Sequence, residues 1–374
     1  MGSRKKDFNF IIHNCKEPLI FRQSLEWDTF CWDISKWKDI LNDESLQFRC
    51  GLNAKTITPQ WESSTRMVHG NFEDLLELSN PRKWLYFDYK YLNEHFLNAN
   101  ELRENINFED LGLTGVSASD STIWIGSKGA HTPCHIDTYG CNVVVQIYGK
   151  KRWLLFPFEE DLKPTRIPYE ESSIYSKLNF FSPNEISDFK DISNCKAVIL
   201  NPGDVLIVPH KWWHYVENLE LAITINTWLP LPQDSVERQK ECLIQTIMGC
   251  FTQHLSKNKQ DMILNPNSKE DVLQSNLTTG VELQNKLSQV SPILNAVTDE
   301  DHVLKIDQLI NKYKIDKIES YSSNELKAFL ENQATRFSND LIDHKEEENI
   351  NVEKFIHAIT HPDVIQLMMK KLIE

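Results

Sequence analysis

The sequence has no uninterrupted apolar run long enough to cross a bilayer. A spanning helix needs ~18 consecutive apolar residues, and the 374-residue chain contains no such run. The opening residues, MGSRKKDFNF, include basic side chains, but no apolar core of a secretory signal follows them. We therefore expect a cytoplasmic protein, with the nucleus as a second location, that makes no contact with a membrane.

The chain also lacks paired cysteines. Its eight cysteines are scattered, and no two of them form a Cys-x-x-Cys pair. Zinc knuckles and disulfide frameworks need regular cysteine spacing, so the sequence predicts reduced thiols rather than either of these.

The sequence also has no excess of basic residues over acidic ones. Asp and Glu number 54 against 40 Lys and Arg, which gives a formal net charge of -14. Generic binding to the phosphate backbone of nucleic acid needs a basic surface, so nucleic acid is an unfavoured partner unless a local basic patch exists. The hydrophobic fraction of 40% is enough for one large core or two moderate ones.

Up to about residue 230, the chain consists mainly of short runs rich in β-branched and aromatic residues and bounded by turn residues. Such runs predict strands. They lie at residues 17–21, 121–127, 142–149, 151–158, 197–202, 204–210 and 221–229. Apolar side chains at helical spacing predict short helices at 34–43 and 72–79. Many short strands with turns between them predict a sandwich or barrel.

After Pro232 the pattern becomes helical. Apolar side chains at three- and four-residue spacing predict a helix over 234–255, which Asp234 or Ser235 would cap. Further helices are predicted at 281–297, 301–313 and from Pro362 to the end, with a polar connection at 256–271 and a solvated acidic stretch at 339–354.

These patterns divide the chain into a β-rich domain, residues 1–230, and a C-terminal helical region, residues 231–374. The last helix is amphipathic, so its apolar stripe could pack on the barrel or on a second subunit. We favour a homodimer formed through these C-terminal helices.

The stretch HTPCHIDTYGCN, residues 131–142, contains side chains that bind metals. Alternate side chains of a strand share a face, so His135 and Asp137 project the same way and can hold one cation together. A non-haem iron(II) site takes two histidines and one carboxylate on one face of an octahedron. The later stretch VPHKWWHYVEN offers two candidates for the missing ligand, His210 and His214.

Two other histidine positions are not assigned to the predicted metal site. His361 and Asp363 repeat the His-x-Asp pattern, but Pro362 opens a helix there, and the helix dipole explains an aspartate in its first turn. His131 is expected in a loop, because its spacing to His135 suits a helix and not a strand.

The stretch around His135 has further polar neighbours. An oxygenase that uses 2-oxoglutarate needs a cation for the distal carboxylate of this cosubstrate, with hydroxyl donors beside it, and lysine suits that role as a compact point charge. Lys150 and Lys151 follow the next strand, and Thr132 stands three residues before His135. Taken alone, the two lysines could equally be a solvated hairpin end.

The residues STIWIGSKGAHTPCHIDTYGCNVVVQIYGKKRWLLFPF, followed by LNPGDVLIVPHKWWHYVENL and ITINTW, resemble the JmjC-domain proteins, in particular their small hydroxylase-type members. The resemblance covers roughly residues 7–230 and recurs in the last helix. It implies a mainly β fold: a double-stranded β-helix core (jelly-roll, cupin-like) with flanking N-terminal helices and a C-terminal helical region. It also implies the cofactors iron(II) and 2-oxoglutarate.

The resemblance assigns the metal ligands to His135, Asp137 and His214, with His210 as a neighbour. It places the cosubstrate lysine at Lys151, two residues after Gly149, and leaves Lys150 at the surface. Further residues around the cosubstrate fall on Thr132, Asn142, Tyr86, Trp124, Asn226 and Trp228. The spacing from His135 to Asn142 is one residue longer than in the asparaginyl hydroxylase of the family, and Tyr86 and Trp124 could instead be core aromatics.

The resemblance implies an oxygenase that hydroxylates a side chain of a protein substrate, and it offers a small heat-shock protein as partner. Two alternatives stay open: an adaptor for a small heat-shock protein with little or no activity, and a hydroxylase of a modified RNA base, which the acidic net charge disfavours. Histone demethylation is less favoured, because the cysteine spacing of a zinc-binding reader is missing. The loop PTRIPYEESS should lie near the pocket mouth, where we expect Arg166, Tyr169 and Glu170 to bind a partner.

Overall fold

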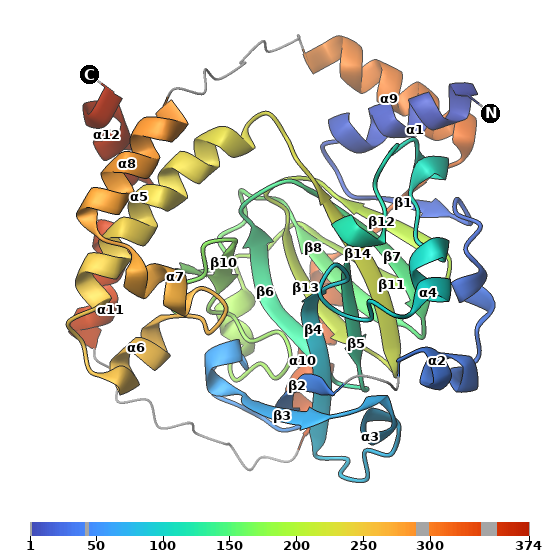
Figure 1. Cartoon of the computed structure of the whole chain (residues 1–374), viewed down its shortest axis with the longest axis horizontal. Coiled ribbons are helices and arrows are strands. Elements are labelled where there is room, and N and C mark those ends of the chain that lie inside the picture. Colours follow the sequence, from blue (N-terminus) through green and yellow to red (C-terminus); the bar gives the residue numbers. More distant parts are fainter. Residues whose placement is uncertain (1, 42–44, 289–298, 338–349, 374) are drawn as a thin grey trace.

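The computed structural model describes the chain except for residues 1, 42–44, 289–298, 338–349 and 374 (Figure 1). In the described part, two antiparallel sheets form the centre of the molecule. The first sheet contains, in spatial order, β15 (Asp316–Lys317), β1 (Leu19–Arg22), β12 (Asp204–Val208), β7 (Cys141–Tyr148), β14 (Ala222–Leu229), β5 (Thr122–Gly126), β4 (Lys83–Tyr91), β2 (Leu46–Leu52) and β3 (Arg66–Gly70). The second contains β16 (Ser320–Tyr321), β11 (Cys195–Leu200), β8 (Lys151–Phe156), β13 (Trp213–Asn218), β6 (His131–Asp137), β10 (Ser173–Ser176) and β9 (Pro164–Thr165).

Helices flank the sheets on several sides. They are α1 (Gly2–Asn14), α2 (Ile34–Leu41), α3 (Phe72–Leu76), α4 (Asn100–Asn105), α5 (Asp234–Thr252), α6 (Lys257–Ile263), α7 (Lys269–Gln274), α8 (Leu277–Ser288), α9 (Asp299–Tyr313), α10 (Ser323–Thr335), α11 (Ile350–Ile359) and α12 (Pro362–Ile373). The jelly-roll core with flanking helices that the sequence predicted is therefore confirmed. None of the described helices is both long and apolar enough to span a membrane.

Strands of the core are buried on both faces. In β7, Val143 and Val145 join the cluster under the N-terminal helices, whereas Val144 joins the cluster between the sheets. Trp153 and Val216 of the second sheet meet Val144 in that inner cluster. Because successive side chains of a strand alternate in direction, a strand covered on both sides reads as a continuous apolar run.

The helices after residue 230 lie in three places. In Figure 1, α5, α8, α11 and α12 lie together to one side of the barrel, where α6 and α7 join them. By contrast, α9 lies beside α1 and α10 packs against the second sheet. Residues 316–321 between them form β15 and β16, which extend both sheets. The division of the chain at residue 230 stays a prediction.

Several elements differ from the sequence prediction. The polar connection predicted at 256–271 is wrong, because α6 and α7 lie there and bury Ile263 and Val272 against α5. Helices α1 and α10 and strands β2 to β4 were not predicted. Residues 289–297 of one predicted helix, and 339–349 of the acidic stretch, lie outside the described residues.

A β-bulge in β6 shapes the site. In the pairing of β6 with β13, His135 faces His214, but Thr132 faces Val216, so one extra residue is accommodated in β6 between the two pairs. Thr132 and His135 are three residues apart and would point to opposite faces of a regular strand. The bulge turns both side chains to the same side.

Candidate metal centre

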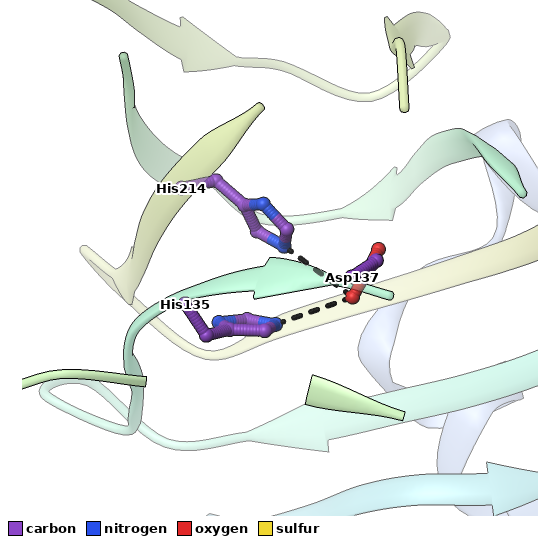
Figure 2. A group of neighbouring side chains, drawn as sticks. All are labelled: His135, Asp137 and His214. Carbon is purple, nitrogen blue, oxygen red and sulfur yellow. Dashed lines mark ion pairs between the residues drawn. The ribbon is translucent and has the colours of Figure 1, made fainter. Parts of the chain in front are cut away.

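Three side chains from two neighbouring strands converge inside the barrel. His135 and Asp137 stand two residues apart on β6, and His214 lies on β13 directly opposite His135 (Figure 2). The distance from Asp137 Oδ1 to His135 Nε2 is 3.5 Å, and that to His214 Nε2 is 3.9 Å. Ligand atoms of all three residues lie within 4.8 Å of one another, so a single cation can contact all of them.

Backbone carbonyl groups orient both imidazole rings. Nδ1 of His135 lies 2.9 Å from the carbonyl oxygen of Pro133, and Nδ1 of His214 lies 3.0 Å from that of Trp212. A carbonyl oxygen only accepts hydrogen bonds, so each Nδ1 carries the hydrogen and donates it. Each Nε2 is thereby left with the lone pair that binds a metal.

The carboxylate of Asp137 is held by its other oxygen. Its Oδ2 accepts hydrogen bonds from Trp228 Nε1 at 2.8 Å and from Asn142 Nδ2 at 3.1 Å. Asn226 donates to Asn142 at 2.8 Å, and Trp124 donates to Asn226 at 2.7 Å. Trp124, Asn226 and Asn142 thus form a chain of hydrogen bonds that ends at Asp137 Oδ2, and Trp228 binds the same oxygen, which leaves Oδ1 directed at the two imidazoles.

Burial and neighbouring charges set the protonation of the three side chains. Burial and the adjacent His135 lower the pKa of His214 to about 4, so this ring is neutral at pH 7. Burial also acts to lower the pKa of His135, but the hydrogen bond and charge of Asp137 outweigh it and raise the pKa. The pKa of Asp137 is held well below its usual range, because the imidazoles outweigh the effect of its burial.

Two imidazole nitrogens and one carboxylate oxygen fit the facial triad of non-haem iron(II) sites. Over the described residues, this is the group of three His, Cys, Asp or Glu side chains that could hold a metal. His210 is outside it, and His361 and Asp363 are exposed on the surface near α12.

His131 was predicted in a loop, and that prediction is wrong. It is the first residue of β6, buried with 1% of its surface exposed, and its ring stacks on Phe181 with centroids 3.8 Å apart. The bulge places it on the face opposite His135, in the aromatic packing around Trp84. The argument from spacing failed because His131 is part of the strand and the bulge changes which side chains share a face.

All ten residues that the resemblance assigned to the site line one narrow cavity of about 40 Å³ between the sheets. They are Tyr86, Trp124, Thr132, His135, Asp137, Asn142, Lys151, His214, Asn226 and Trp228. The structure thus brings the predicted residues together, while the role of each in cofactor binding stays a prediction.

Lys151 supplies the positive charge deep in this cavity. Its side chain is buried, and its Nζ donates to Thr224 Oγ1 at 2.7 Å and to Tyr86 OH at 3.2 Å. Burial lowers the pKa of Lys151 to about 7. Its neighbour Lys150 is exposed, as predicted.

Some lining residues were missed although the sequence contained a signal for them. Thr224 stands two residues before Asn226 on β14, and Trp153 stands two residues after Lys151 on β8, so alternation places both in the cavity. Trp153 stacks on the His214 ring with centroids 5.6 Å apart.

Tyr89 could not be found from alternation. It lies where the pairing of β4 with β5 shifts register between Phe87 and Lys90, and its φ is +55°, a value that a bulky side chain rarely adopts. Its ring packs edge-on to Trp124 and Trp228, with centroids 5.8 and 5.7 Å away. The irregular backbone of β4 therefore directs an aromatic ring to the cavity entrance.

The predicted partner-binding loop is mostly covered. Arg166 and Tyr169 are 7% and 0% exposed, because the loop lies under α5, where Arg166 forms an ion pair with Glu241. The prediction that these two residues bind a partner is wrong, because α5 docks on the loop and nothing in the loop's own residues indicates that contact. Glu170 is also buried but faces a pocket.

An outer pocket of about 540 Å³, which we call the vestibule, opens from the inner cavity. The two share Trp124, Thr132, His135, Asp137 and Trp228. A molecule that enters the vestibule would therefore reach His135 and Asp137.

Comparison with known proteins shows which family a chain with this fold and this site belongs to. The chain belongs to the cupin-like (JmjC) domain family: the family model described as "Cupin-like domain" matches residues 36–234. Among curated relatives, HSPB1-associated protein 1 of Homo sapiens is 36% identical over 281 residues, which are 70% of this chain and 57% of that protein. The HSPB1-associated protein 1 homolog of Danio rerio is 33% identical over 68% of this chain and 61% of its own length.

Two further matches are less similar in sequence. Lysine-specific demethylase JMJ30 of Arabidopsis thaliana is 30% identical over 42% of this chain and 37% of its own length. The X-ray structure of E. coli ycfD aligns at 14% identity over 79% of this chain and 65% of that chain, with a TM-score of 0.34, too low to support an argument. The chain spans less than two thirds of the length of the HSPB1-associated relatives.

Proposed function

We propose that this protein is an iron(II)- and 2-oxoglutarate-dependent oxygenase that hydroxylates a side chain of a protein substrate. The observation that carries the proposal is the joint presence, in one buried cavity, of a two-histidine, one-carboxylate triad and a lysine. A triad alone would fit a structural metal. A buried lysine in the same cavity has no such structural use, because its burial costs stability.

When bound, iron(II) and 2-oxoglutarate supply the chemistry that activates dioxygen and oxidises a C–H bond. His135, Asp137 and His214 would hold the metal on one face and leave the opposite positions open. The hydrogen bonds from Trp228 and Asn142 keep Asp137 Oδ1 directed at the metal position. The protein's contribution is therefore to orient the reactants and to exclude water.

Lys151 would bind the distal carboxylate of 2-oxoglutarate. Its Nζ is buried between Tyr86 and Thr224, whose hydroxyl groups can donate to the same carboxylate. In a site shielded from water, a charge-assisted hydrogen bond of this kind is strong.

Names of the relatives support a second role for the protein. The curated relatives from human and zebrafish are named for association with HSPB1. We therefore propose a small heat-shock protein as partner, either as substrate or as the protein to which this chain acts as an adaptor with little activity of its own.

A modified RNA base is a less favoured substrate. Besides the metal ligand Asp137, the vestibule is lined by Glu62, Asp88, Glu170 and Glu171, and carboxylates repel a phosphate backbone. We further propose that the protein acts in the cytoplasm or nucleus, where its eight cysteines would stay reduced thiols.

We also propose a homodimer through α8 and α12. These two helices and α5 line an apolar groove of about 570 Å³. Leu277 and Val281 of α8 and Leu372 of α12 are 67%, 46% and 54% exposed in the groove wall. A two-fold pairing would cover the same apolar surface on both subunits.

Titration of the manganese(II)-loaded protein with 2-oxoglutarate tests the proposed oxygenase. We expect micromolar binding in the wild type and in His361→Ala, and none in His135→Ala. His361 is the matched control, since it has the same His-x-Asp pattern on an exposed surface. A folded, metal-loaded wild type that does not bind 2-oxoglutarate would contradict the proposal and favour the adaptor.

A further inference from the structure

One arginine joins the two sheets beside the inner cavity. Arg49 lies on β2 of the first sheet, and only 1% of its surface is exposed. Its Nη2 donates at 2.8 Å to the backbone carbonyl of His131, on β6 of the second sheet. Its Nε donates to Asp88 on β4 at 2.7 Å, and its Nη1 donates to the backbone carbonyl of Gln60 at 3.1 Å. Each nitrogen of the guanidinium therefore holds a different segment of the chain.

Stability alone does not explain a charged side chain at this position. A guanidinium loses its hydration when it is buried, and a buried ion pair often stabilises a protein no better than apolar side chains of similar size. Arg49 lines the vestibule, where its Cζ lies 5.1 Å from the ring centroid of Trp84 and 5.7 Å from that of Tyr86. The charge is thus placed beside the candidate site and not in the middle of an apolar cluster.

The carbonyl group that Arg49 holds belongs to the β-bulge. Its peptide group joins His131 to Thr132, and Thr132 is the residue that the bulge turns to the same side as His135. A bulge disrupts the hydrogen bonds between strands locally, so its shape depends on other contacts. The bond from Arg49 is such a contact, and it fixes the backbone that places Thr132 in the wall of the inner cavity.

A second contact of Arg49 bears on Lys151. In the pairing of β2 with β4, Arg49 stands opposite Tyr86, whose hydroxyl group accepts a hydrogen bond from Lys151. Burial lowers the pKa of Lys151, and the charge of Asp88 opposes this effect, so the carboxylate attracts the lysine. Because Arg49 pairs with Asp88, this carboxylate competes less with a ligand for the ammonium group.

We propose that Arg49 is a positioning residue for the distal carboxylate of 2-oxoglutarate. Through the carbonyl of His131 it keeps Thr132 in the cavity wall, and through its ion pair with Asp88 it leaves Lys151 available to the ligand. Arg49 lines the vestibule and not the inner cavity, so it acts through these neighbours. The inference rests on the proposed function, because it concerns the cosubstrate of that same site.

Two ligands of the metal-loaded protein separate this role from a general structural one. 2-Oxoglutarate and oxalate can both chelate a metal, but oxalate has no distal carboxylate. Calorimetry of manganese(II)-saturated protein gives the affinity for each. In Arg49→Lys, a single ammonium nitrogen cannot reach the three acceptors that the guanidinium holds. We expect the affinity for 2-oxoglutarate to fall at least about tenfold, and that for oxalate to stay within about twofold of the wild type.

Arg166→Lys is the matched control, since Arg166 is also buried and ion-paired but lies under α5. Both of its affinities should equal those of the wild type. If Arg49→Lys does not fold, the double variant Arg49→Met and Asp88→Leu replaces the buried pair with apolar side chains. The same selective loss is expected there, because the carbonyl of His131 again loses its donor.

Equal losses of both affinities in a folded variant would overturn the inference, because they would mean that Arg49 is only structural. Wild-type affinity for both ligands would overturn it as well. A wild type that binds oxalate but not 2-oxoglutarate contradicts the proposed function instead. A wild type that binds both ligands, with variants that show no selective loss, refutes the inference alone.

Discussion

Asn226 acts on the candidate metal ligand Asp137 through Asn142. The amide of Asn226 donates to Asn142 at 2.8 Å, and Asn142 in turn donates to Asp137 Oδ2 at 3.1 Å. The two amides thus fix which oxygen of the carboxylate faces the imidazoles. Groups that orient a metal ligand commonly change metal affinity 10–100-fold when removed.

Replacing Asn142 with alanine should therefore weaken manganese(II) binding about 10-fold or more. The ligands themselves stay in place, so the variant should still bind the metal at higher concentration. Titration followed by electron paramagnetic resonance of free manganese(II) measures this. Ser119→Ala, on the 3-10 helix between α4 and β5, serves as the control. Wild-type affinity in Asn142→Ala would show that the hydrogen bond does not position Asp137.

Lys151 should destabilise the free protein. Its folded-state pKa of about 7 lies below the value of 10.5 for an exposed lysine, so the unfolded chain binds more protons between these pH values. Stability should rise with pH from about 7 to 10.5, and the burial cost is largest at pH 7 and below. We expect Lys151→Met to be more stable by about 2 kcal/mol or more at pH 7, and unable to bind 2-oxoglutarate.

Urea unfolding of the metal-free protein at pH 6.5 and pH 10 checks that expectation. The advantage of Lys151→Met should shrink at the higher pH. Lys150→Met, an exposed neighbour, should change stability by less than about 0.5 kcal/mol. An advantage that does not depend on pH would mean that Lys151 is fully charged in the folded state.

The same lysine predicts a pH dependence of cosubstrate binding. Above about pH 7, Lys151 is increasingly neutral in the free protein, and a bound carboxylate would raise its pKa again. Affinity of the metal-loaded protein for 2-oxoglutarate should therefore fall by up to about tenfold per pH unit above 7, with uptake of a proton. Calorimetry at pH 8 in buffers of different ionisation enthalpy measures that proton. Oxalate, which has no distal carboxylate, should bind without this uptake; equal proton uptake for both ligands would place the titration on another group.

The proposed dimer forms through the apolar groove between α8 and α12. Charged side chains introduced into this groove should therefore dissociate it. The double variant Leu277→Asp and Leu372→Asp places two carboxylates where the apolar contact would form, so we expect monomers with unchanged 2-oxoglutarate binding. Leu304→Asp on α9 is the matched control, since Leu304 is 63% exposed away from the groove. Sedimentation velocity distinguishes the species. A wild type that sediments as a monomer at 100 μM, on the order of the highest concentration practical, would refute the proposed dimer.

Much of the centre of the molecule could be predicted from sequence. Strands such as β7 and β14 are apolar, β-branched and bounded by turn residues, and alternation alone pairs His135 with Asp137. The third ligand could be chosen only from the family resemblance, because the spacing in the sequence fitted His210 and His214 equally well. Only the fold places His214 opposite His135.

The rest could not be predicted, because it depends on local irregularity and on contacts between distant residues. No pattern in the sequence predicts the bulge that turns Thr132 to the same side as His135. The positive φ of Tyr89 is equally unpredicted. The loop around Tyr169 was expected at the pocket mouth, free to bind a partner, because its polar residues give no sign of the helix that covers it. The burial of Glu170 could not be predicted either, because it also depends on a contact with a distant part of the chain.

The short strands β15 and β16 come late in the chain, and one edge of each sheet is uncovered until they have been made. Ile20 pairs with Asp316 and Lys196 pairs with Ser320, so one hexapeptide covers an edge of each sheet. Exposed sheet edges invite pairing between chains. During synthesis, both edges stay uncovered until some three hundred residues after β1 have been added, and a fragment that stops at residue 230 would keep them open and be prone to aggregate.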